Sequence, residues 1–258
     1  MAEAIIGGVL RQPDAKSGDI CVGEPIEIRR DQLAKLYGVA TSSANLEACQ
    51  WGDLVILSVK PQNLPDVLTE LRGALRKEQT VVSIVAGARM ETIVSGLRHD
   101  KVIRVMPNTP AQIGAGMSLW LASPSVIQEI REAVRTILAN LGEELEVGEE
   151  KYLDMATALS ASGPAYVFLF IESLIDAGVH IGMSRNMART LALQTVLGSA
   201  EFAQASDKHP AELRDMVTSP GGTTAEALKV LEEGRFRATV MNAVAAAYER
   251  AKSLGGQR

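Results

Sequence analysis

The 258-residue sequence is short of the residues on which disulfide frameworks and metal centres are built. It contains only two cysteines, Cys21 and Cys49, and they form no close pairing motif. Disulfide-rich domains and structural zinc sites use several cysteines at short spacings, so neither is expected. The three histidines are scattered along the chain, which argues against a histidine-based metal centre. We therefore predict no metal site.

Aromatic residues make up only 4% of the chain, and no signal peptide or membrane-length apolar run stands out. The apolar stretch at 166–171 is interrupted soon afterwards by Glu172 and Asp176. The formal net charge of −5 argues against nucleic acid or an anionic membrane as a partner, because both attract basic surfaces. A hydrophobic content of 47% with 22% charged residues is typical of a globular protein, and we expect it in the cytoplasm.

Short apolar stretches alternate with helical patterns over the first 149 residues. The expected strands cover residues 20–23, 53–59, 81–85, 102–105, 117–121 and 145–147. The expected helices cover residues 1–12, 29–37, 89–97 and 126–141, with another opened by Pro61. Strands without polar alternation, each followed by a helix, are typical of a parallel sheet covered on both faces. We predict an α/β, Rossmann-like domain over 1–149, with ligands at the carboxyl ends of its strands.

Strand signals are missing after residue 149. The expected helices cover residues 152–160, 164–181, 185–203, 211–217, 225–233 and 236–254. The stretch Tyr166–Ile171 is apolar on nearly every side, so we expect it in a core or against a second subunit. The sequence thus predicts an all-helical second domain over 150–258.

The segment Thr218–Thr224 combines a proline, two glycines and four hydroxyl side chains ahead of a helix. Its glycines remove the Cβ atoms that would keep a ligand from the backbone, and Thr223 or Thr224 is expected to cap the helix. Free N–H groups and hydroxyls at a helix N-terminus suit a carboxylate or a phosphate. An ordinary Pro-Gly turn before a capped helix fits the spacing equally well.

This segment resembles the signature of the pyrroline-5-carboxylate reductase family, and three more segments fit that family in the same order. They are Val59–Gln62, Val105–Pro110 and Ser160–Tyr166, and the similarity runs from Ala2 to about Leu254. The resemblance implies reduction of a cyclic imine, 1-pyrroline-5-carboxylate, to L-proline by NADPH or NADH, the last step of proline biosynthesis. It also implies a homodimer formed through the helical domain, with higher assembly possible in the family.

The resemblance places the substrate carboxylate on the glycine- and threonine-rich loop. The expected substrate-binding residues are Ser219, Gly221, Gly222, Thr223, Thr224 and Asn108. Thr224 is the candidate catalytic residue, whose hydroxyl would donate a hydrogen bond or relay a proton to the imine nitrogen. A hydroxyl of ordinary acidity is a poor acid at neutral pH, so an already protonated iminium is an alternative, as is a capping role alone.

The expected cofactor-binding residues lie mostly at strand ends. They are Glu24, Asn45, Ser58, Val59, Lys60, Pro61, Val85 and Ala86. Taken singly, Lys60 would be a solvated lysine, Asn45 an N-cap and Asn108 a turn former. The family motifs around Lys60 and Asn108 favour ligand contacts instead, whereas Asn45 is left equally open.

Cofactor preference is ambiguous in the sequence. Glu24, at the end of a strand, favours hydrogen bonds to ribose hydroxyls and hence NADH. Arg29 and Arg30 lie close by in the sequence and could receive the 2′-phosphate of NADPH instead. The balance of the two signals leans slightly towards NADH.

One part of the family pattern is missing: the strand and G-x-G-x-x turn that would precede Ala2–Ile6. Gly7 and Gly8 do not replace that turn, because they fall within a helix. The turn normally holds the pyrophosphate and the strand is normally central, so we expect its loss to cost cofactor affinity and stability. We expect the natural start roughly ten to fifteen residues upstream.

Two other functions compete with the reductase. One is a truncated homologue that binds substrate or product but has lost the cofactor. The other is a related two-domain enzyme of the β-hydroxyacid dehydrogenase or ketol-acid reductoisomerase type. The latter would need a lysine acid/base or magnesium-binding carboxylates in the helical half, and neither stands out.

Overall fold

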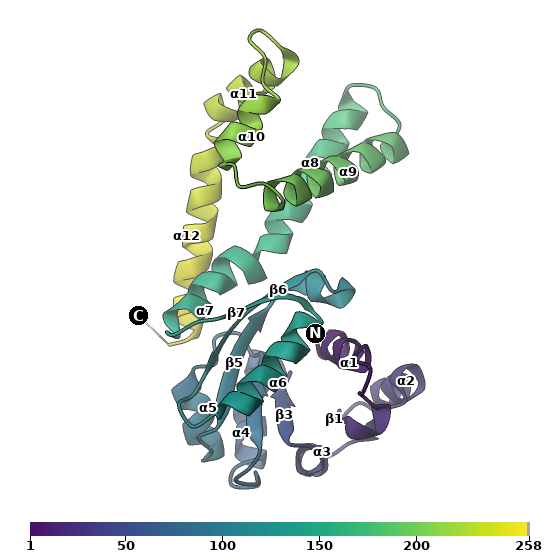
Figure 1. Cartoon of the computed structure of the whole chain (residues 1–258), viewed down its shortest axis with the longest axis vertical. Coiled ribbons are helices and arrows are strands. Elements are labelled where there is room, and N and C mark those ends of the chain that lie inside the picture. The colour runs from purple at the N-terminus through teal and green to yellow at the C-terminus, as the bar shows by residue number, and fades with distance from the viewer. Residues whose placement is uncertain (257–258) are drawn as a thin grey trace. The chain divides into compact units, whose positions relative to one another are not determined.

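The computed structural model describes residues 1–256 and divides into two compact units (Figure 1). The first unit comprises Met1–Ser162 together with the C-terminal residues from Ala247 onward. The second comprises Gly163–Ala246. Every strand of the described residues belongs to the first unit, as the sequence predicted for the two halves of the chain.

The strands of the first unit form two sheets. The smaller sheet pairs β1 (Cys21–Gly23) with β2 (Ala40–Ser42) in parallel. The larger has the order β3-β4-β5-β6-β7, with bounds Leu54–Leu57, Thr80–Ser83, Val102–Pro107, Gly116–Ala122 and Gly142–Glu146. The predicted parallel arrangement is confirmed for β3, β4 and β5.

Strand β6 runs antiparallel to β5, which the sequence analysis did not anticipate. The connection between them holds only a short 3₁₀ helix, Thr109–Ile113, and a parallel neighbour needs a longer crossover. The following helix, α6 (Gln128–Ala139), then returns the chain so that β7 pairs with β6 in parallel. The reversal is therefore confined to one edge of the sheet.

The helices of the first unit fall largely where the hydrophobic periodicity placed them. Their bounds are α1 Ala2–Leu10, α2 Glu27–Tyr37, α3 Asn45–Trp51, α4 Leu64–Glu70, α5 Met90–Leu97 and α7 Lys151–Ala156, with a π-helical turn at Thr157–Ala161. Pro61 opens a 3₁₀ turn, Pro61–Asn63, that leads into α4. Gly38 ends α2 in the left-handed conformation that the sequence predicted, with φ of 69°.

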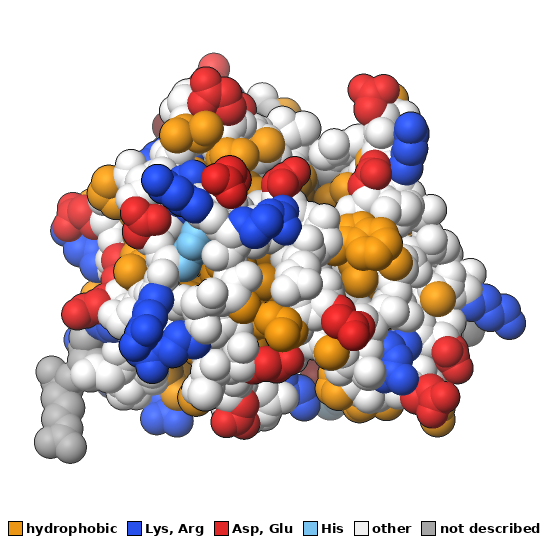
Figure 2. Space-filling view, turned by 90° about the horizontal axis from the view of Figure 1, so that it is seen from below, with side chains coloured by type: hydrophobic (Ala, Val, Ile, Leu, Met, Phe, Trp, Pro, Cys, Tyr) orange, Lys and Arg blue, Asp and Glu red, His pale blue; other side chains and the backbone are white. Residues whose placement is uncertain are grey.

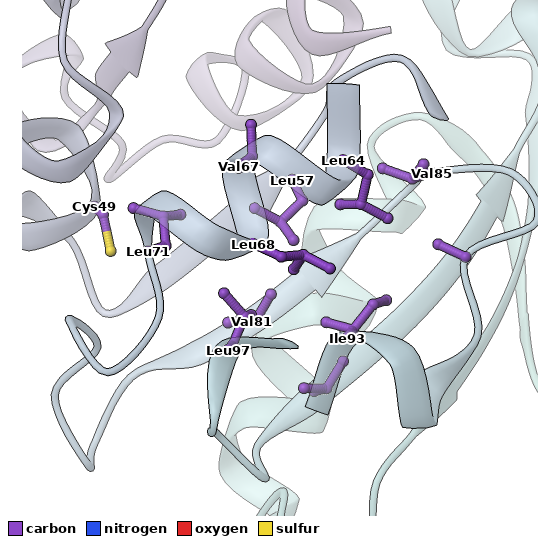
Figure 3. Close-up of a cluster of buried hydrophobic side chains, with 12 residues drawn as sticks. Cys49, Leu57, Leu64, Val67, Leu68, Leu71, Val81, Val85, Ile93 and Leu97 are labelled. Carbon is purple, nitrogen blue, oxygen red and sulfur yellow. The ribbon is translucent and has the colours of Figure 1, made fainter. Parts of the chain in front are cut away.

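The five-stranded sheet carries a hydrophobic core on each face. Successive residues of β4 point to opposite faces, so Val81 packs with α4 and α5 (Figure 3), whereas Val82 packs with α1 and α6. The central strands β4 and β5 are fully buried along their described lengths. This burial fixes the carboxyl ends of these strands as a rigid platform.

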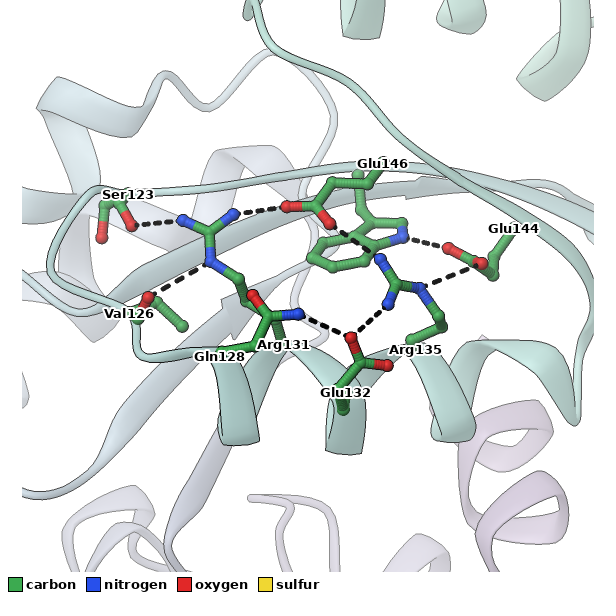
Figure 4. Close-up of polar contacts among 9 residues, drawn as sticks. Ser123, Val126, Gln128, Arg131, Glu132, Arg135, Glu144 and Glu146 are labelled. Carbon is green, nitrogen blue, oxygen red and sulfur yellow. Dashed lines mark hydrogen bonds and ion pairs between the residues drawn. The ribbon is translucent and has the colours of Figure 1, made fainter.

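Charged side chains lock α6 onto the edge strand β7 (Figure 4). Arg131 pairs with Glu146, and Arg135 pairs with Glu146 at 2.9 Å and stacks 5.5 Å from the centre of the Trp120 ring. Because this network places carboxylates along β7, it also discourages edge-to-edge pairing with another sheet. Its role is structural.

The two sheets are not hydrogen-bonded to each other, although α1 packs against both of them. Ile5 belongs to the core of the larger sheet and Ile6 to the cluster beside the smaller one. Strand β3 is only partly buried, apart from Leu57, so the expected cover on both faces is not met there.

The second unit consists of helices, as predicted. They are α8 (Gly163–His180), α9 (Arg185–Gln204), α10 (Pro210–Met216), α11 (Thr223–Glu233) and α12 (Phe236–Leu254), of which the last enters the first unit at Ala247. Helices α8 and α9 pack closely where Gly178 faces Ala188. The apolar stretch of α8 is not in the core of the single chain, since Phe168 and Leu169 are 61% and 64% exposed.

The helical run Lys151–His180 is long and apolar enough to span a membrane, with a mean hydropathy of 1.5 in its most apolar window. Glu172 and Asp176 lie within this run, and the expectation that it does not span a membrane stays a prediction. One helix selected by length and composition alone is weak support for a membrane segment.

Candidate functional site

The predicted cofactor-binding residues gather at the carboxyl ends of parallel strands. Glu24 directly follows β1, and Asn45 lies three residues after β2. In the larger sheet, Ser58–Pro61 follow β3 and Val85–Ala86 follow β4. Leu57 at the end of β3 is in register with Ser83 at the end of β4, so these two sets share one edge. Such an edge is where dinucleotides bind in open α/β sheets.

Glu24 and Arg30 together shape the end of β1. A carboxylate oxygen of Glu24 accepts a hydrogen bond from the Ile26 N–H at 3.0 Å. The Arg30 guanidinium donates to the carbonyls of Glu24 and Pro25, both at 2.9 Å. The Glu24 carboxylate and the Arg30 guanidinium are thus both hydrogen-bonded to the backbone of the turn that follows β1. The guanidinium is held in place by backbone, which leaves further N–H groups for a ligand.

Arg29 is engaged elsewhere, so the two arginines named in the sequence analysis are not equivalent. Its guanidinium forms an ion pair with Glu3 of α1 and donates to Gln32 at 3.1 Å. It therefore braces α1 against α2. Arg30 is the better placed of the two to meet a ribose phosphate.

Asn45 is not an N-cap. Ala44 occupies the cap position of α3, and Asn45 is the first residue of the helix. Its amide nitrogen donates to Glu70 at 2.8 Å, while its amide oxygen lies against Gly23, where a Cβ would come within 2.8 Å. The end of β1 therefore has to be a residue without a side chain for Asn45 to fit.

Lys60 is exposed and has no hydrogen bond assigned to its ammonium in the described residues. It precedes Pro61, whose ring starts the 3₁₀ turn, so the backbone direction at this strand end is fixed. A positive charge at this edge is available to an anionic ligand. Within residues 1–256, Lys60 forms no ion pair.

The loop after β4 is fixed by contacts of Glu150, a residue that is not among the predicted site residues. The Met90 N–H at the start of α5 donates to the Glu150 carboxylate at 2.6 Å. The same carboxylate pairs at 2.5 Å with Arg104 of β5, whose side chain is 4% exposed. An arginine inside an otherwise apolar buried strand was the sequence signal of this network, because a buried charge requires a partner.

Asn108 bridges two parts of the first unit through its amide. The amide oxygen accepts from the Met117 N–H at 2.9 Å, and the amide nitrogen donates to the carbonyl and hydroxyl of Ser160, both at 3.3 Å. Both ends of this amide are therefore used within the protein. The geometry gives Asn108 a structural role and ties the Val105–Pro110 segment to the Ser160 segment.

The loop that the sequence predicts to hold the substrate, Ser219–Thr224, lies in the second unit and leads into α11. The expected capping by Thr223 or Thr224 is wrong: Gly222 occupies the N-cap position, and no side chain accepts from the helix N–H groups. Gly221 has φ of 71°, which favours glycine, and a Cβ on Gly222 would collide with the Ser219 hydroxyl. Gly221 therefore favours glycine for its backbone conformation, a side chain at Gly222 would displace the Ser219 hydroxyl, and the threonine hydroxyls do not cap the helix.

The described residues contain no group of three or more histidine, cysteine or acidic side chains that could hold a metal ion. Both cysteines are free, and burial raises the pKa of each thiol above its ordinary value. A thiol with a raised pKa is a poor metal ligand and a poor nucleophile at neutral pH. The chemistry of the candidate site therefore depends on hydroxyl, amide and backbone N–H groups.

A shallow pocket of about 400 Å³ lies at the end of α5 away from the loop after β4. Its lining residues are Leu75, Lys77, Val94, Arg98, His99 and Asp100. None of the predicted site residues lines it. Figure 2 shows one face of the molecule on which basic and acidic side chains are interspersed, a pattern unlike the continuous basic surface of a nucleic-acid-binding protein.

Comparisons with known proteins agree with these motifs. Residues 150–254 match the family model "Pyrroline-5-carboxylate reductase dimerisation", and residues 1–87 match "NADP oxidoreductase coenzyme F420-dependent". The chain is 44% identical to pyrroline-5-carboxylate reductase of Synechocystis over 99% of its own length and 95% of the relative's. It is 39% identical to the Escherichia coli enzyme of that name, covering 98% and 94% of the two chains.

The solved structures give the same result. The crystal structure of Plasmodium falciparum pyrroline carboxylate reductase with NADP bound superposes with a TM-score of 0.89 at 35% identity. The match covers 98% of this chain and 94% of the other. Identity at this level over nearly the full length, together with the substrate loop and the strand-end motifs, shows that the chain belongs to the pyrroline-5-carboxylate reductase family.

Proposed function

We propose that the chain reduces 1-pyrroline-5-carboxylate to L-proline, with NADPH or NADH as the hydride donor, in the last step of proline biosynthesis. The observation that carries the proposal is the Ser219–Thr224 loop, whose two glycines and whose threonine hydroxyls, free of helix capping, suit a carboxylate. Relatives that bear the reductase name over nearly the whole chain support it.

The chain's own residues would bind and orient the imine. Backbone N–H groups at the start of α11, with the hydroxyls of Ser219 and Thr223, hold the carboxylate at the positive end of the helix. The Thr224 hydroxyl donates a hydrogen bond to the imine nitrogen or relays a proton to it. A bound nicotinamide would supply the hydride for the imine carbon, the π electrons of the C=N bond would pass to nitrogen, and the nitrogen would carry the proton that Thr224 holds or relays. No metal or covalent intermediate is required.

The strand ends of the first unit fit a nicotinamide dinucleotide. Glu24 and Arg30 provide groups for the ribose hydroxyls and for a 2′-phosphate respectively, and Lys60 provides an unconsumed positive charge. Because the Arg30 guanidinium is fixed by its hydrogen bond to the Glu24 carbonyl, NADPH is as good a candidate for the hydride donor as NADH. Ser58, Val59, Pro61, Val85 and Ala86 would line the same edge, and contact of Asn45 and Asn108 with ligands remains part of the proposal.

We further propose that the chain works as a homodimer formed through its helical part, with higher assembly possible. Helix α8 exposes a run of apolar side chains that a single chain leaves uncovered, and a second copy would bury them. The match to a dimerisation model over residues 150–254 supports this. Location in the cytoplasm, and the expectation of neither a membrane nor a nucleic-acid partner, stay predictions.

The proposal is tested by oxidation of NADPH and NADH in the presence of pyrroline-5-carboxylate. The assay compares this chain with a version extended by a strand and a G-x-G-x-x turn ahead of Ala2. We expect imine-dependent oxidation, with the extended version binding the dinucleotide about tenfold more tightly, because the turn adds charge-assisted hydrogen bonds to the pyrophosphate.

Two outcomes would count against this account. If neither version oxidises NADPH or NADH in the presence of the imine, the reductase proposal fails. If both versions are active with equal dinucleotide affinity, the added turn is dispensable, and our account of cofactor binding is wrong.

A further inference from the structure

The C-terminal end of α12 packs onto the loop between β4 and α5, more than 160 positions earlier in the chain. The Arg89 Nε donates to the Gly255 carbonyl at 2.6 Å. On the other side of the loop bend, a Cβ placed on Gly87 would lie 3.2 Å from both the Cβ and the carbonyl oxygen of Leu254. These contacts all fall within the first unit.

The loop at this point has an unusual backbone. Gly87 has φ of 73°, a conformation that side-chain-bearing residues rarely adopt, and its neighbours Val85 and Ala88 are buried. The absent Cβ is what lets Leu254 approach so closely. The loop and the C-terminal segment are therefore fitted to each other.

The loop is held at its other end as well. The Met90 N–H, at the first residue of α5, donates to Glu150, which is anchored in turn by Arg104. The stretch between β4 and α5 is thus fixed at Met90 by one network and at Gly87 and Arg89 by another. The contacts at Met90 are made by Glu150 and the β5 residue Arg104, whereas those at Gly87 and Arg89 are made by Leu254 and Gly255.

We propose that Leu254–Gly256 form a C-terminal clamp that holds the Val85–Arg89 loop in the shape that receives the nicotinamide dinucleotide, with Arg89 as the positioning residue. The proposal rests on the proposed function, since Val85 and Ala86 are the residues that would line the cofactor. A side chain fixed by a charged hydrogen bond to a helix-end carbonyl restrains the backbone on which it is carried. Releasing that bond lets the loop open locally while the rest of the sheet stays intact.

The test compares four versions: the chain as it is, Arg89→Ala, Arg89→Lys, and a chain ending at Ser253. Arg250→Ala is the matched control, because this exposed arginine of α12 donates to Ser253 in its own helix and, within residues 1–256, to no residue of the loop. Amide hydrogen exchange is read for residues 85–90 without ligand, and the dissociation constant of NADPH is read by nicotinamide fluorescence.

We expect Arg89→Ala and the shortened chain to speed exchange at 85–90 and to weaken NADPH binding about tenfold, because the charge-assisted hydrogen bond to the Gly255 carbonyl is lost in both. Arg89→Lys should keep the slow exchange at 85–90 and most of the NADPH affinity, because an ammonium can donate to the same carbonyl. Arg250→Ala should change neither quantity. The melting temperature and the exchange of the β4 and β5 amides should stay as in the unchanged chain.

Unchanged exchange at 85–90 would overturn the clamp, and so would faster exchange spread over the whole sheet. Faster exchange confined to the loop with unaltered NADPH affinity would overturn its role in cofactor binding. If the unchanged chain binds neither NADPH nor NADH, the proposed function fails, while the exchange measurement still decides whether the clamp exists.

Discussion

Replacing Thr224 with alanine is expected to lower kcat for pyrroline-5-carboxylate reduction about a hundredfold. Thr224 lies in the first turn of α11, and its hydroxyl is not used to cap the helix, because Gly222 occupies the N-cap position. The hydroxyl is therefore available to the imine nitrogen, where negative charge would otherwise build up as hydride arrives. The measurement is steady-state oxidation of NADPH at saturating imine.

Two matched variants separate chemistry from structure at this position. Thr224→Ser keeps the hydroxyl and should retain kcat within about fivefold, a small part of the hundredfold contribution of a positioned proton donor. Thr224→Ala should not lower the melting temperature, because alanine favours helix and no capping bond is lost. If Thr224→Ala keeps full kcat, the iminium is already protonated in solution, and the hydroxyl has no role in the chemical step.

Replacing Glu150 with alanine is expected to destabilise the chain by about 3 kcal/mol, because it leaves the buried Arg104 guanidinium without its counter-charge. The change also removes the acceptor of the Met90 N–H. For a chain of this size such a loss lowers the melting temperature by roughly 10 °C. Thermal unfolding followed by circular dichroism measures it.

The neighbouring residue provides the control. Glu149 pairs with Lys151 at the surface, where both side chains are about half exposed, so Glu149→Gln should leave the melting temperature nearly unchanged. Replacing both partners, as Arg104→Met with Glu150→Leu, should recover much of the lost stability, since no charge is then left unpaired in the core. A Glu150→Ala chain as stable as the original would show that water reaches Arg104 and that the pair is not buried.

The helical half of the chain was predictable because its signals are local. Each helix has an apolar face at 3.6-residue spacing, and its ends carry proline, glycine or serine, as Ser184 does when it caps α9. The strand ends were predictable for the same reason. Apolar runs end abruptly at Lys60 and Asn108, and parallel strands bring such ends to one edge.

The features that the sequence did not predict have physical causes as well. Strand β2 has only three residues, too few to show a pattern, and the direction of β6 depends on the length of a connection rather than on its own residues. Side-chain partners depend on long-range contacts. Nothing near Asn108 in the sequence indicates that its amide bonds to Met117 and Ser160. The contact between Gly87 and Leu254 is likewise invisible before folding.

The central claim is direct hydride transfer to the imine carbon, and isotope transfer tests it most directly. The chain is incubated with pyrroline-5-carboxylate and with NADPH or NADH carrying deuterium on either face of the nicotinamide C4, and the product is analysed by chiral chromatography and mass spectrometry. The account predicts L-proline one mass unit heavier, with deuterium on the former imine carbon, from one of the two labelled faces. Absence of proline, or L-proline that is unlabelled with both faces, would contradict it.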